Sequence, residues 1–289
     1  MTPAQERSAA FFDLDKTVIA RSSTFVFSRP FHAEGLISRP ALLRGAYARF
    51  FYQVSGADHD QRERMRQQLS RLVTGWPVQQ VQDIVATTLA ELITPLVYEE
   101  ATALIASHRE AGRDVVIVSA SGTDVVEPIG AMLGVDHVVA TRMAIADGRY
   151  TGEIEYYAYG ENKAEAIRSL AAENGYRLQD SYAYSDSFTD LPMLEVVGHP
   201  HAVNPDKALR REAVTRDWPV LDFNRPVSLR SRFPSPAAAR AAALGAGPRA
   251  RAAAAEIGTG PAVAVALGAG AATAGLVWLA NRRRERPAV

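Results

Sequence analysis

The chain has 289 residues with 32 basic and 32 acidic side chains, so it is long enough for a core domain with an insert and has no overall positive charge for nucleic-acid binding. It contains no cysteine, which excludes a disulfide framework, a thiolate zinc site and a cysteine nucleophile. The charge is divided unevenly: residues 225–289 hold ten arginines and two glutamates, a net charge of +8, which leaves −8 for residues 1–224. We therefore expect an acidic body, a basic tail and no nucleic-acid partner.

A short strand followed by a long helical segment is predicted for the first third of the chain. Residues 9–14 are apolar except for Asp13, which is typical of a strand covered on both faces. From residue 20 to 96, apolar residues fall three and four positions apart, as in VQQVQDIVATTLAELI, which predicts an α-helical insert. A helix over residues 97–110 then leads through Gly112 into the apolar run DVVIVS, a strand that ends at Ser119.

Strands and helices alternate from there to residue 224. The chain reads in turn as helix, strand, hairpin, helix, strand, helix and strand in the segments TDVVEPIGAMLG, HVVAT, ADGRYTGE, KAEAIRSLAAENG, SYAYSD, LPMLEVVG and HAVN. The hairpin covers residues 146–153 and contains an Asp-Gly turn. This alternation predicts right-handed crossovers, and hence a Rossmann-like, doubly wound parallel sheet built from residues 9–19 and 97–224. Ligands bind outside the carboxyl ends of strands in such a sheet, so polar residues directly after strands are the functional candidates.

The residues after the sheet have a different composition. Residues 225–256 are rich in Ala, Arg and Pro and are predicted to form a linker. Residues 257–281 carry no charged side chain and are long enough to cross about 30 Å of hydrocarbon as a helix, which predicts a transmembrane segment. Ala and Gly dominate this segment, so an Ala-rich tail without a span stays open as an alternative. The N-terminus MTPAQERSAAFF has no signal-peptide pattern, and we expect a cytoplasmic domain anchored to the cell membrane by its C-terminus.

Two carboxylates stand at the end of the first predicted strand. Asp13 and Asp15 are two positions apart, so on an extended chain both side chains face the same way. Two unpaired anions would repel each other, and one would keep its proton unless a cation lay between them. Mg²⁺ favours carboxylate oxygens, water and phosphate, so it resolves this conflict and requires a further oxygen ligand elsewhere.

Further polar residues follow the later strands. Asp186 and Asp190 come directly after SYAY and can supply the further oxygen ligand. Ser119 ends the strand VVIVS and is followed by the amides of ASG, while Lys163 lies at a helix start. A hydroxyl, backbone N–H groups and an ammonium around a metal form a site for a phosphoryl group.

The order of these motifs resembles the haloacid dehalogenase superfamily of phosphohydrolases: DxDxT, an apolar strand ending in Ser, a Lys and Asp-x-x-x-Asp. The helical insert between the first and second motifs is similar to the α-helical cap of the phosphoserine-phosphatase-like branch, here residues 20–96. The resemblance covers about residues 9–224. It implies that Asp13 is the nucleophile, that Asp15 is the general acid and base, and that Thr17 supports the loop.

The same resemblance implies the remaining roles. Ser119 and Lys163 would bind the phosphoryl oxygens. Asp13, the main-chain carbonyl of Asp15 and Asp186 would hold Mg²⁺, with Asp190 beside them. The predicted function is therefore a Mg²⁺-dependent phosphomonoester hydrolase with an aspartyl-phosphate intermediate.

The substrate is predicted only as a class. In phosphoserine phosphatases a glutamate nine positions after the nucleophile recognises the substrate amine, and Ser22 stands at that position here. The loop read as Gly-Asp-Gly-x-Asn-Asp in that family is SDSFTD here, at residues 185–190. We expect a small phosphorylated metabolite or a phospholipid head group, the latter because residues 42–54 could form an amphipathic helix at a membrane surface. The alternative is a tail-anchored binding or regulatory protein with a little-used phosphatase site.

Three histidines show no metal-ligand spacing. His32, His59 and His108 have no ligand-like partners at the spacing of a metal site. We expect them on the surface or in the insert.

Overall fold

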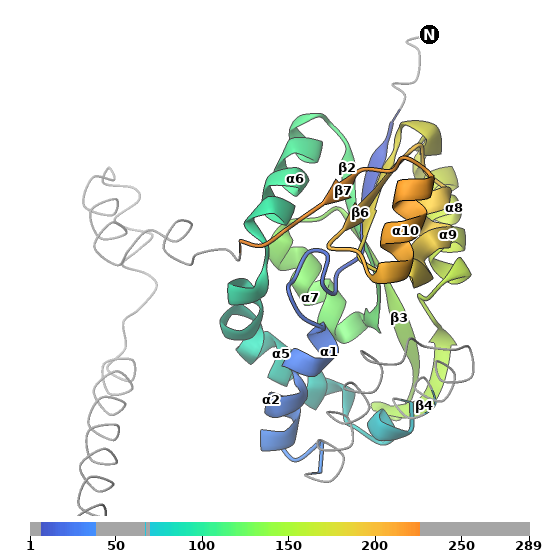
Figure 1. Ribbon diagram of the computed structural model, residues 1–289. Helices are drawn as coiled ribbons and strands as arrows, with labels where there is room; N and C mark the ends of the chain where they lie inside the picture. The colour runs from blue at the N-terminus through green and yellow to red at the C-terminus, as the bar shows by residue number, and fades with distance from the viewer. Residues whose placement is uncertain (1–6, 39–66, 68–69, 226–289) are drawn as a thin grey trace, which may run out of the picture. The chain divides into compact units, whose positions relative to one another are not determined.

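The computed structural model describes residues 7–38, 67 and 70–225 (Figure 1). The predicted amphipathic helix at 42–54, His59, the transmembrane segment at 257–281 and nearly all of the linker lie outside these residues. Among the residues that are described, no helix is both long enough and apolar enough to cross a membrane.

The described residues form a seven-stranded sheet in the order β4-β3-β2-β1-β5-β6-β7. All neighbouring strands are parallel except β3 and β4, which are antiparallel. The strands are β1 (Ala9–Phe12), β2 (Asp114–Gly122), β3 (His137–Ala146), β4 (Arg149–Tyr156), β5 (Tyr182–Ser185), β6 (His199–Val203) and β7 (Val220–Leu221). The predicted α/β class and the Rossmann-like parallel core are confirmed.

The predicted hairpin is also confirmed, as the β3–β4 pair. Asp147 and Gly148 link the two strands and both have positive φ, 49° and 71°. Two left-handed residues match the right-handed twist of the flanking strands, and the Asp-Gly sequence adopts this conformation readily.

Helices cover both faces of the sheet because the central strands are apolar on both sides. Along β1, Phe12 packs into one hydrophobic cluster and Phe11 into the other, and both side chains are fully buried. The cluster around Phe12 takes residues from α6 (Glu99–Glu110) and α7 (Thr123–Leu133). The cluster around Phe11 takes residues from α8 (Glu161–Asn174), α9 (Leu191–Glu195) and α10 (Lys207–Thr215). Figure 1 shows α6 and α7 apart from α8, α9 and α10, as a doubly wound sheet requires.

The described part of the segment between β1 and β2 is largely helical. It contains α1 (Ser23–Val26), α2 (Ser28–Ala33), α5 (Val78–Ile93) and the 3₁₀ turn η1 (Thr94–Leu96). Phe27, Phe31 and Trp76 from this segment are buried in the same cluster as Phe12. The helical segment therefore shares its hydrophobic core with one face of the sheet.

The β3–β4 hairpin holds the start of α5. The Gly75 N–H donates to the carbonyl of Tyr150 at 2.7 Å, and the Val78 N–H donates to that of Gly148 at 3.0 Å. Asp124 at the start of α7 accepts from the Tyr150 hydroxyl at 2.6 Å and from Gln82 of α5 at 2.9 Å. These contacts fix the position of α5 against the end of β2.

One histidine is buried against the sheet rather than on the surface. His108 on α6 is 2% exposed and lies edge-on to the rings of Phe12 and Tyr184. Its Nδ1 accepts from Arg113 Nε at 2.7 Å, so Nε2 carries the proton and donates to the Tyr184 hydroxyl at 2.8 Å. Burial, with the charge of Arg113 adding to it, lowers the pKa of His108 to about 4. The expectation of a surface or insert position was wrong for His108.

Candidate active site

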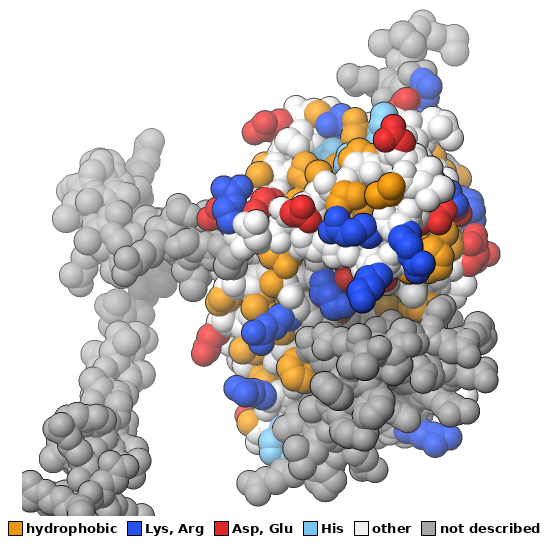
Figure 2. Space-filling model, in the orientation of Figure 1, with side chains coloured by type: hydrophobic (Ala, Val, Ile, Leu, Met, Phe, Trp, Pro, Cys, Tyr) orange, Lys and Arg blue, Asp and Glu red, His pale blue; other side chains and the backbone are white. Residues whose placement is uncertain are grey.

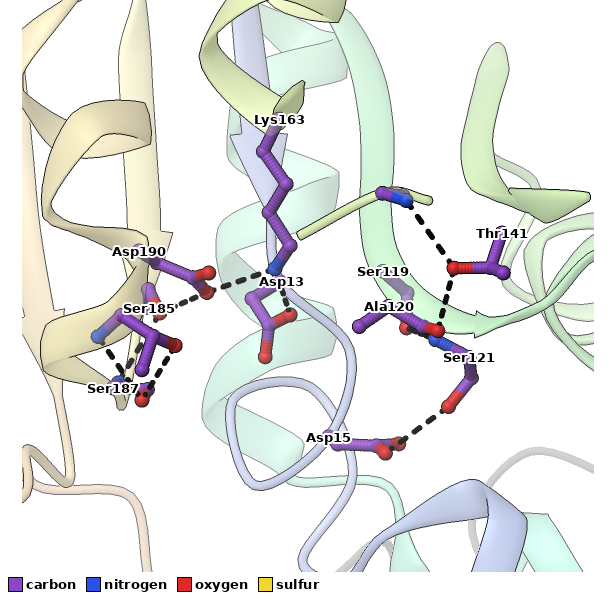
Figure 3. Close-up of polar contacts among 12 residues, drawn as sticks. Asp13, Asp15, Ser119, Ala120, Ser121, Thr141, Lys163, Ser185, Ser187 and Asp190 are labelled. Atoms are coloured by element: carbon purple, nitrogen blue, oxygen red, sulfur yellow. Dashed lines mark hydrogen bonds and ion pairs between the residues drawn. The ribbon is translucent and has the colours of Figure 1, made fainter. Parts of the chain in front are cut away.

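Three neighbouring strands bring predicted motif residues together at their carboxyl ends (Figure 3). Asp13 is the first residue after β1, and its N–H donates to the carbonyl of Tyr184 on β5 at 2.9 Å. Ser119 lies in β2 and Ser185 ends β5, and both strands pair with β1. Because parallel strands end on the same side, the loops after β1, β2 and β5 meet there.

Lys163 connects two of the predicted carboxylates. It lies in the first turn of α8, is 2% exposed, and donates to Asp13 Oδ1 at 2.7 Å and to Asp190 Oδ2 at 2.8 Å. Burial alone would lower the pKa of Lys163, but the charges of Asp13 and Asp190 outweigh it and raise the pKa above its ordinary value. The lysine is therefore charged, and its ammonium is held between the carboxyl groups of Asp13 and Asp190.

The acidic residues carry more negative charge than this lysine balances. Burial raises the pKa of Asp13 well above its usual range, and the charges of Asp190 and Asp186 add to the effect while Lys163 opposes it. Burial also raises the pKa of Asp186 to about 7, although Lys16 Nζ lies 3.6 Å from its Oδ2 and acts in the other direction. A further cation near these clustered carboxylates would oppose the upward shifts of their pKa values.

Asp15 points away from this cluster toward the helical insert. Its Oδ1 accepts from the N–H of Ser23 at 2.8 Å, and its Oδ2 accepts from the Ser121 hydroxyl at 3.3 Å. Burial raises the pKa of Asp15, and the bonds from these serines oppose that shift. Asp15 lies beyond the regular strand, because β1 ends at Phe12 and the turn that follows covers residues 16–18, so strand alternation does not determine its direction.

The turn after β1 contains Lys16 and Thr17. The N–H groups of Val18 and Ile19 both donate to the carbonyl of Leu14 at 3.0 Å, and Lys16 has a left-handed backbone with φ 66°. Thr17 is fully buried, and its hydroxyl has no hydrogen-bond partner among the described residues. Among the described residues, Thr17 therefore contributes packing to the turn and no side-chain hydrogen bond.

Serines shape the loop that carries Asp186 and Asp190. The Ser185 hydroxyl donates to Asp190 Oδ2 at 2.7 Å, so that oxygen is shared between Ser185 and Lys163. Ser187 caps the turn η3 (Phe188–Asp190) by accepting from the Thr189 N–H at 3.3 Å. Hydroxyl groups thus form this loop where the phosphoserine-phosphatase pattern has glycines.

The predicted metal ligands fit a magnesium ion by their chemistry. Asp13 and Asp186 are buried carboxylates with raised pKa values, which is the state that a divalent cation relieves. Among the described residues, no group of three or more His, Cys, Asp or Glu side chains is arranged to hold a metal ion. A site here would therefore combine two carboxylates with the main-chain carbonyl of Asp15, water and phosphate oxygens, as Mg²⁺ commonly does.

Comparison with known proteins identifies the family. The family model described as haloacid dehalogenase-like hydrolase matches residues 10–195, which is more than half of the chain and includes every predicted site residue. The chain belongs to the haloacid dehalogenase-like hydrolases. The resemblance drawn from the order of the motifs is confirmed.

Curated relatives cover most of the chain. The "Inhibition of morphological differentiation protein" of Streptomyces azureus is 60% identical over 279 residues, which cover 96% of this chain and 95% of that protein. A probable phosphatase of Mycobacterium tuberculosis is 59% identical over 235 residues, 81% of this chain and 82% of that protein. A phosphoserine phosphatase of the same species is 31% identical over 223 residues, 76% and 72% of the two chains. The predicted enzyme class, a phosphatase of this family, is confirmed.

Solved structures share the fold. A protein of unknown function from Bordetella pertussis has a TM-score of 0.67 and 30% identity, covering 75% of this chain and 99% of its own. A phosphoserine phosphatase solved as a phospho-aspartyl intermediate analogue has a TM-score of 0.56 and 21% identity, covering 76% and 95%. At that identity the second similarity shows the fold alone.

Sequence reasoning missed the serines that surround the predicted residues. Ser121 lies two positions after Ser119 on the same strand, so the two-residue period of a strand could have linked them. Ser23 comes from a helix of the insert, and no spacing connects it to Asp15 and Ser121 before the chain is folded.

Proposed function

We propose that the chain is a Mg²⁺-dependent phosphomonoester hydrolase that forms an aspartyl-phosphate on Asp13. The observation that carries this proposal is the buried ammonium of Lys163, which lies between Asp13 and Asp190 at the carboxyl ends of β1 and β5. A charged lysine beside a nucleophilic carboxylate can bind a phosphoryl group, because its ammonium offsets the negative charge on the phosphoryl oxygens.

Asp13, the main-chain carbonyl of Asp15 and Asp186 would hold Mg²⁺. When bound, this ion supplies positive charge that lets the clustered carboxylates ionise together and offsets the charge of the phosphoryl group. Asp190 stays beside this set, held by Lys163 and Ser185. Burial raises the pKa of Asp13, so positive charge beside this nucleophile favours its ionised form.

In the first step, one carboxylate oxygen of Asp13 forms a bond to phosphorus while the bond from phosphorus to the ester oxygen breaks. The electron pair of the broken bond leaves with the ester oxygen, which takes a proton from Asp15 and departs as an alcohol. Ser119 and Lys163 bind the phosphoryl oxygens during the transfer.

In the second step, Asp15, now a carboxylate, accepts a proton from a water molecule. The water oxygen bonds to phosphorus and the bond to Asp13 breaks, which releases phosphate and restores both carboxyl groups. One side chain thus serves as acid and then as base.

The substrate class is a small phosphorylated metabolite or a phospholipid head group. A relative that is 31% identical is named as a phosphoserine phosphatase, but Ser22 stands here at the position of the amine-binding glutamate. We therefore propose a phosphomonoester without an ammonium group close to the phosphate.

Figure 2 shows Lys and Arg side chains gathered over α10. The exposed basic residues of α10 and of the turn after β1 include Lys207, Arg210, Arg211 and Lys16. Positive charge at this surface of an acidic body would attract an anionic substrate.

We further propose that residues 20–96 act as a cap over the core, and that residues 257–281 anchor a cytoplasmic catalytic domain to the membrane through the linker. The similarity to the Streptomyces relative covers 96% of the chain and so extends into the residues after 225. A membrane-anchored domain would have access to lipid head groups, and nothing in the charge of the body favours nucleic acid.

Hydrolysis of p-nitrophenyl phosphate tests the proposed function. The purified full-length chain is expected to release phosphate with added Mg²⁺, to lose this activity in EDTA and to recover it when Mg²⁺ is restored in excess. Turnover that is unchanged in EDTA would contradict the metal requirement. Binding of Mg²⁺ and phosphate analogues without turnover of a broad panel of phosphoesters would favour the alternative, a binding or regulatory protein.

A further inference from the structure

Three hydroxyl groups form a hydrogen-bonded group that meets Asp15 through Ser121, and none of them belongs to the predicted catalytic set. Ser121 Oγ lies 3.3 Å from Asp15 Oδ2, 2.8 Å from Ser23 Oγ and 3.3 Å from Thr24 Oγ1. We refer to Ser23, Thr24 and Ser121 as the hydroxyl cluster. Ser23 is fully buried and Ser121 is 7% exposed, so the contact between their hydroxyl groups is shielded from solvent, whereas Thr24 is exposed.

The cluster holds Asp15 from two separate parts of the chain. Ser121 belongs to β2, where it contacts Oδ2, and the N–H of Ser23 at the start of α1 contacts Oδ1. The Ser23 hydroxyl donates to Ser121, which leaves the Ser121 proton for Asp15. Hydrogen bonds in such a chain strengthen one another. Both oxygens of Asp15 therefore have a defined partner, and the rotation of its carboxyl group is restricted.

A hydroxyl is suited to a carboxyl group that changes its protonation during a reaction. It donates to a carboxylate, and after a rotation of its O–H bond it accepts from a carboxylic acid. Ammonium and backbone N–H groups only donate, so they stabilise the carboxylate alone. Ser121 can turn its proton toward Ser23 or Thr24 when Asp15 carries one, because both oxygens lie within hydrogen-bond distance.

The cluster is also joined to the residue expected to bind phosphate. The Ser121 N–H donates to Ser119 Oγ at 3.2 Å, and both serines belong to β2, beside Asp15 in Figure 3. A displacement of Ser121 would therefore change its hydrogen bonds to both Asp15 and Ser119.

We propose that Ser121 is a positioning residue for proton transfer: it holds Asp15 in the orientation in which its proton reaches the leaving oxygen, and through Ser23 it links that orientation to α1. This inference rests on the proposed function, since it concerns the first step of that reaction. It goes beyond it in assigning a role to Ser121 and Ser23.

Two substrates with different leaving groups test the proposal. p-Nitrophenolate is stable as an anion and departs with little help from an acid, whereas the alkoxide of an alkyl phosphate such as glycerol 2-phosphate needs a proton as it leaves. The parameter kcat/KM includes the steps up to alcohol release and excludes the later hydrolysis of the intermediate. In the full-length chain, Ser121→Ala is expected to lower kcat/KM about tenfold or more for the alkyl phosphate, and less than about threefold for p-nitrophenyl phosphate.

Matched variants distinguish a loss of Asp15 positioning from general damage to the fold. Ser121→Thr keeps the hydroxyl and is expected to restore most of the alkyl phosphate activity. Thr123→Val removes a neighbouring hydroxyl that bonds to the Thr141 carbonyl at 3.0 Å, and it is expected to leave the ratio between the two substrates unchanged. If Ser121→Ala does not fold, Ser23→Ala replaces it, because this variant keeps the N–H bond to Asp15 and removes the hydroxyl that donates to Ser121.

The possible results separate the role of Ser121 from the function on which it rests. A selective loss on the alkyl phosphate supports the proposal, while equal losses on both substrates, or none, overturn it and leave the proposed function intact. A wild-type chain that hydrolyses neither substrate overturns the proposed function and the inference with it.

Discussion

Replacing Asp13 with asparagine is expected to lower phosphate release by about 10³-fold or more, because the amide oxygen is a poor nucleophile toward phosphorus. The variant has nearly the same shape as the wild type, and its side-chain oxygen can still accept from Lys163. Lys163 also keeps Asp190 at 2.8 Å, so its charge remains paired. The loss should therefore appear in kcat, measured with p-nitrophenyl phosphate in saturating Mg²⁺, without a large fall in thermal stability.

A surface aspartate provides the control for Asp13. Asp180 forms an exposed ion pair with Arg177 at 2.9 Å, and its side chain is 51% exposed. Asp180→Asn removes the same charge far from the reaction and is expected to keep kcat within about twofold of the wild type. An Asp13→Asn enzyme with activity close to that of Asp180→Asn would rule out Asp13 as the nucleophile.

Replacing Lys163 with methionine is expected to destabilise the fold by about 3–5 kcal/mol near pH 8, and to abolish activity. The side chain is 2% exposed and pairs with Asp13 and Asp190, so its removal leaves two buried carboxyl groups without a counter-charge. Methionine fills a similar volume, which limits the contribution of a cavity to the loss. Urea unfolding in EDTA measures the change without interference from a bound cation.

The destabilisation by Lys163→Met should depend on pH in a defined direction. Burial already raises the pKa of Asp13, and loss of the neighbouring ammonium raises it further. A carboxyl group whose pKa is higher in the folded state than its unfolded value of about 3.9 makes the fold less stable as pH rises through that interval. The deficit relative to the wild type is therefore expected to be smaller near about pH 5 than near about pH 8.

An exposed lysine serves as the control for Lys163. Lys207, at the start of α10, is solvent-exposed, and its replacement with methionine is expected to change the free energy of unfolding by less than about 0.5 kcal/mol. Equal stability of Lys163→Met and Lys207→Met at both pH values would show that the buried ion pairs do not have the importance assigned to them.

The central strands and the residues after them were predictable because their signals are local. The apolar runs that became β1 and β2 are buried on both faces, and their ends point to Asp13 and Ser119 without any knowledge of the rest of the fold. Asp186 follows β5 in the same way. The meeting of these residues then follows from parallel pairing of the strands.

The edge strand β7 and the helix α10 were not predicted because their sequence patterns are weak. β7 has only two residues, Val220 and Leu221, and pairs with β6 alone. α10 buries only Leu209 and Ala213 along its length, so its apolar stripe is too narrow to stand out among charged residues. The position of His108 could have been found, since Ala101, Ile105 and His108 fall four and three residues apart and form the buried stripe of α6.

The serines that surround Asp15 could not be predicted from the sequence, for a different reason. Ser23 and Ser121 are 98 positions apart, and only the packing of α1 against β2 brings them together. Contacts of this kind depend on tertiary structure, and no periodicity or spacing in the chain indicates them.

Trapping of the phosphorylated enzyme tests the central claim most directly. Full-length wild-type chain is mixed with a phosphomonoester and Mg²⁺, quenched in acid within the first turnover, digested at acid pH and examined by peptide mass spectrometry, with Asp13→Asn treated in parallel. We predict a single phosphoryl group on the peptide that contains Asp13, located on that side chain by fragmentation and absent from the variant. Steady phosphate release without phosphate on Asp13 at any quench time, or with phosphate on another residue, would contradict the proposed mechanism.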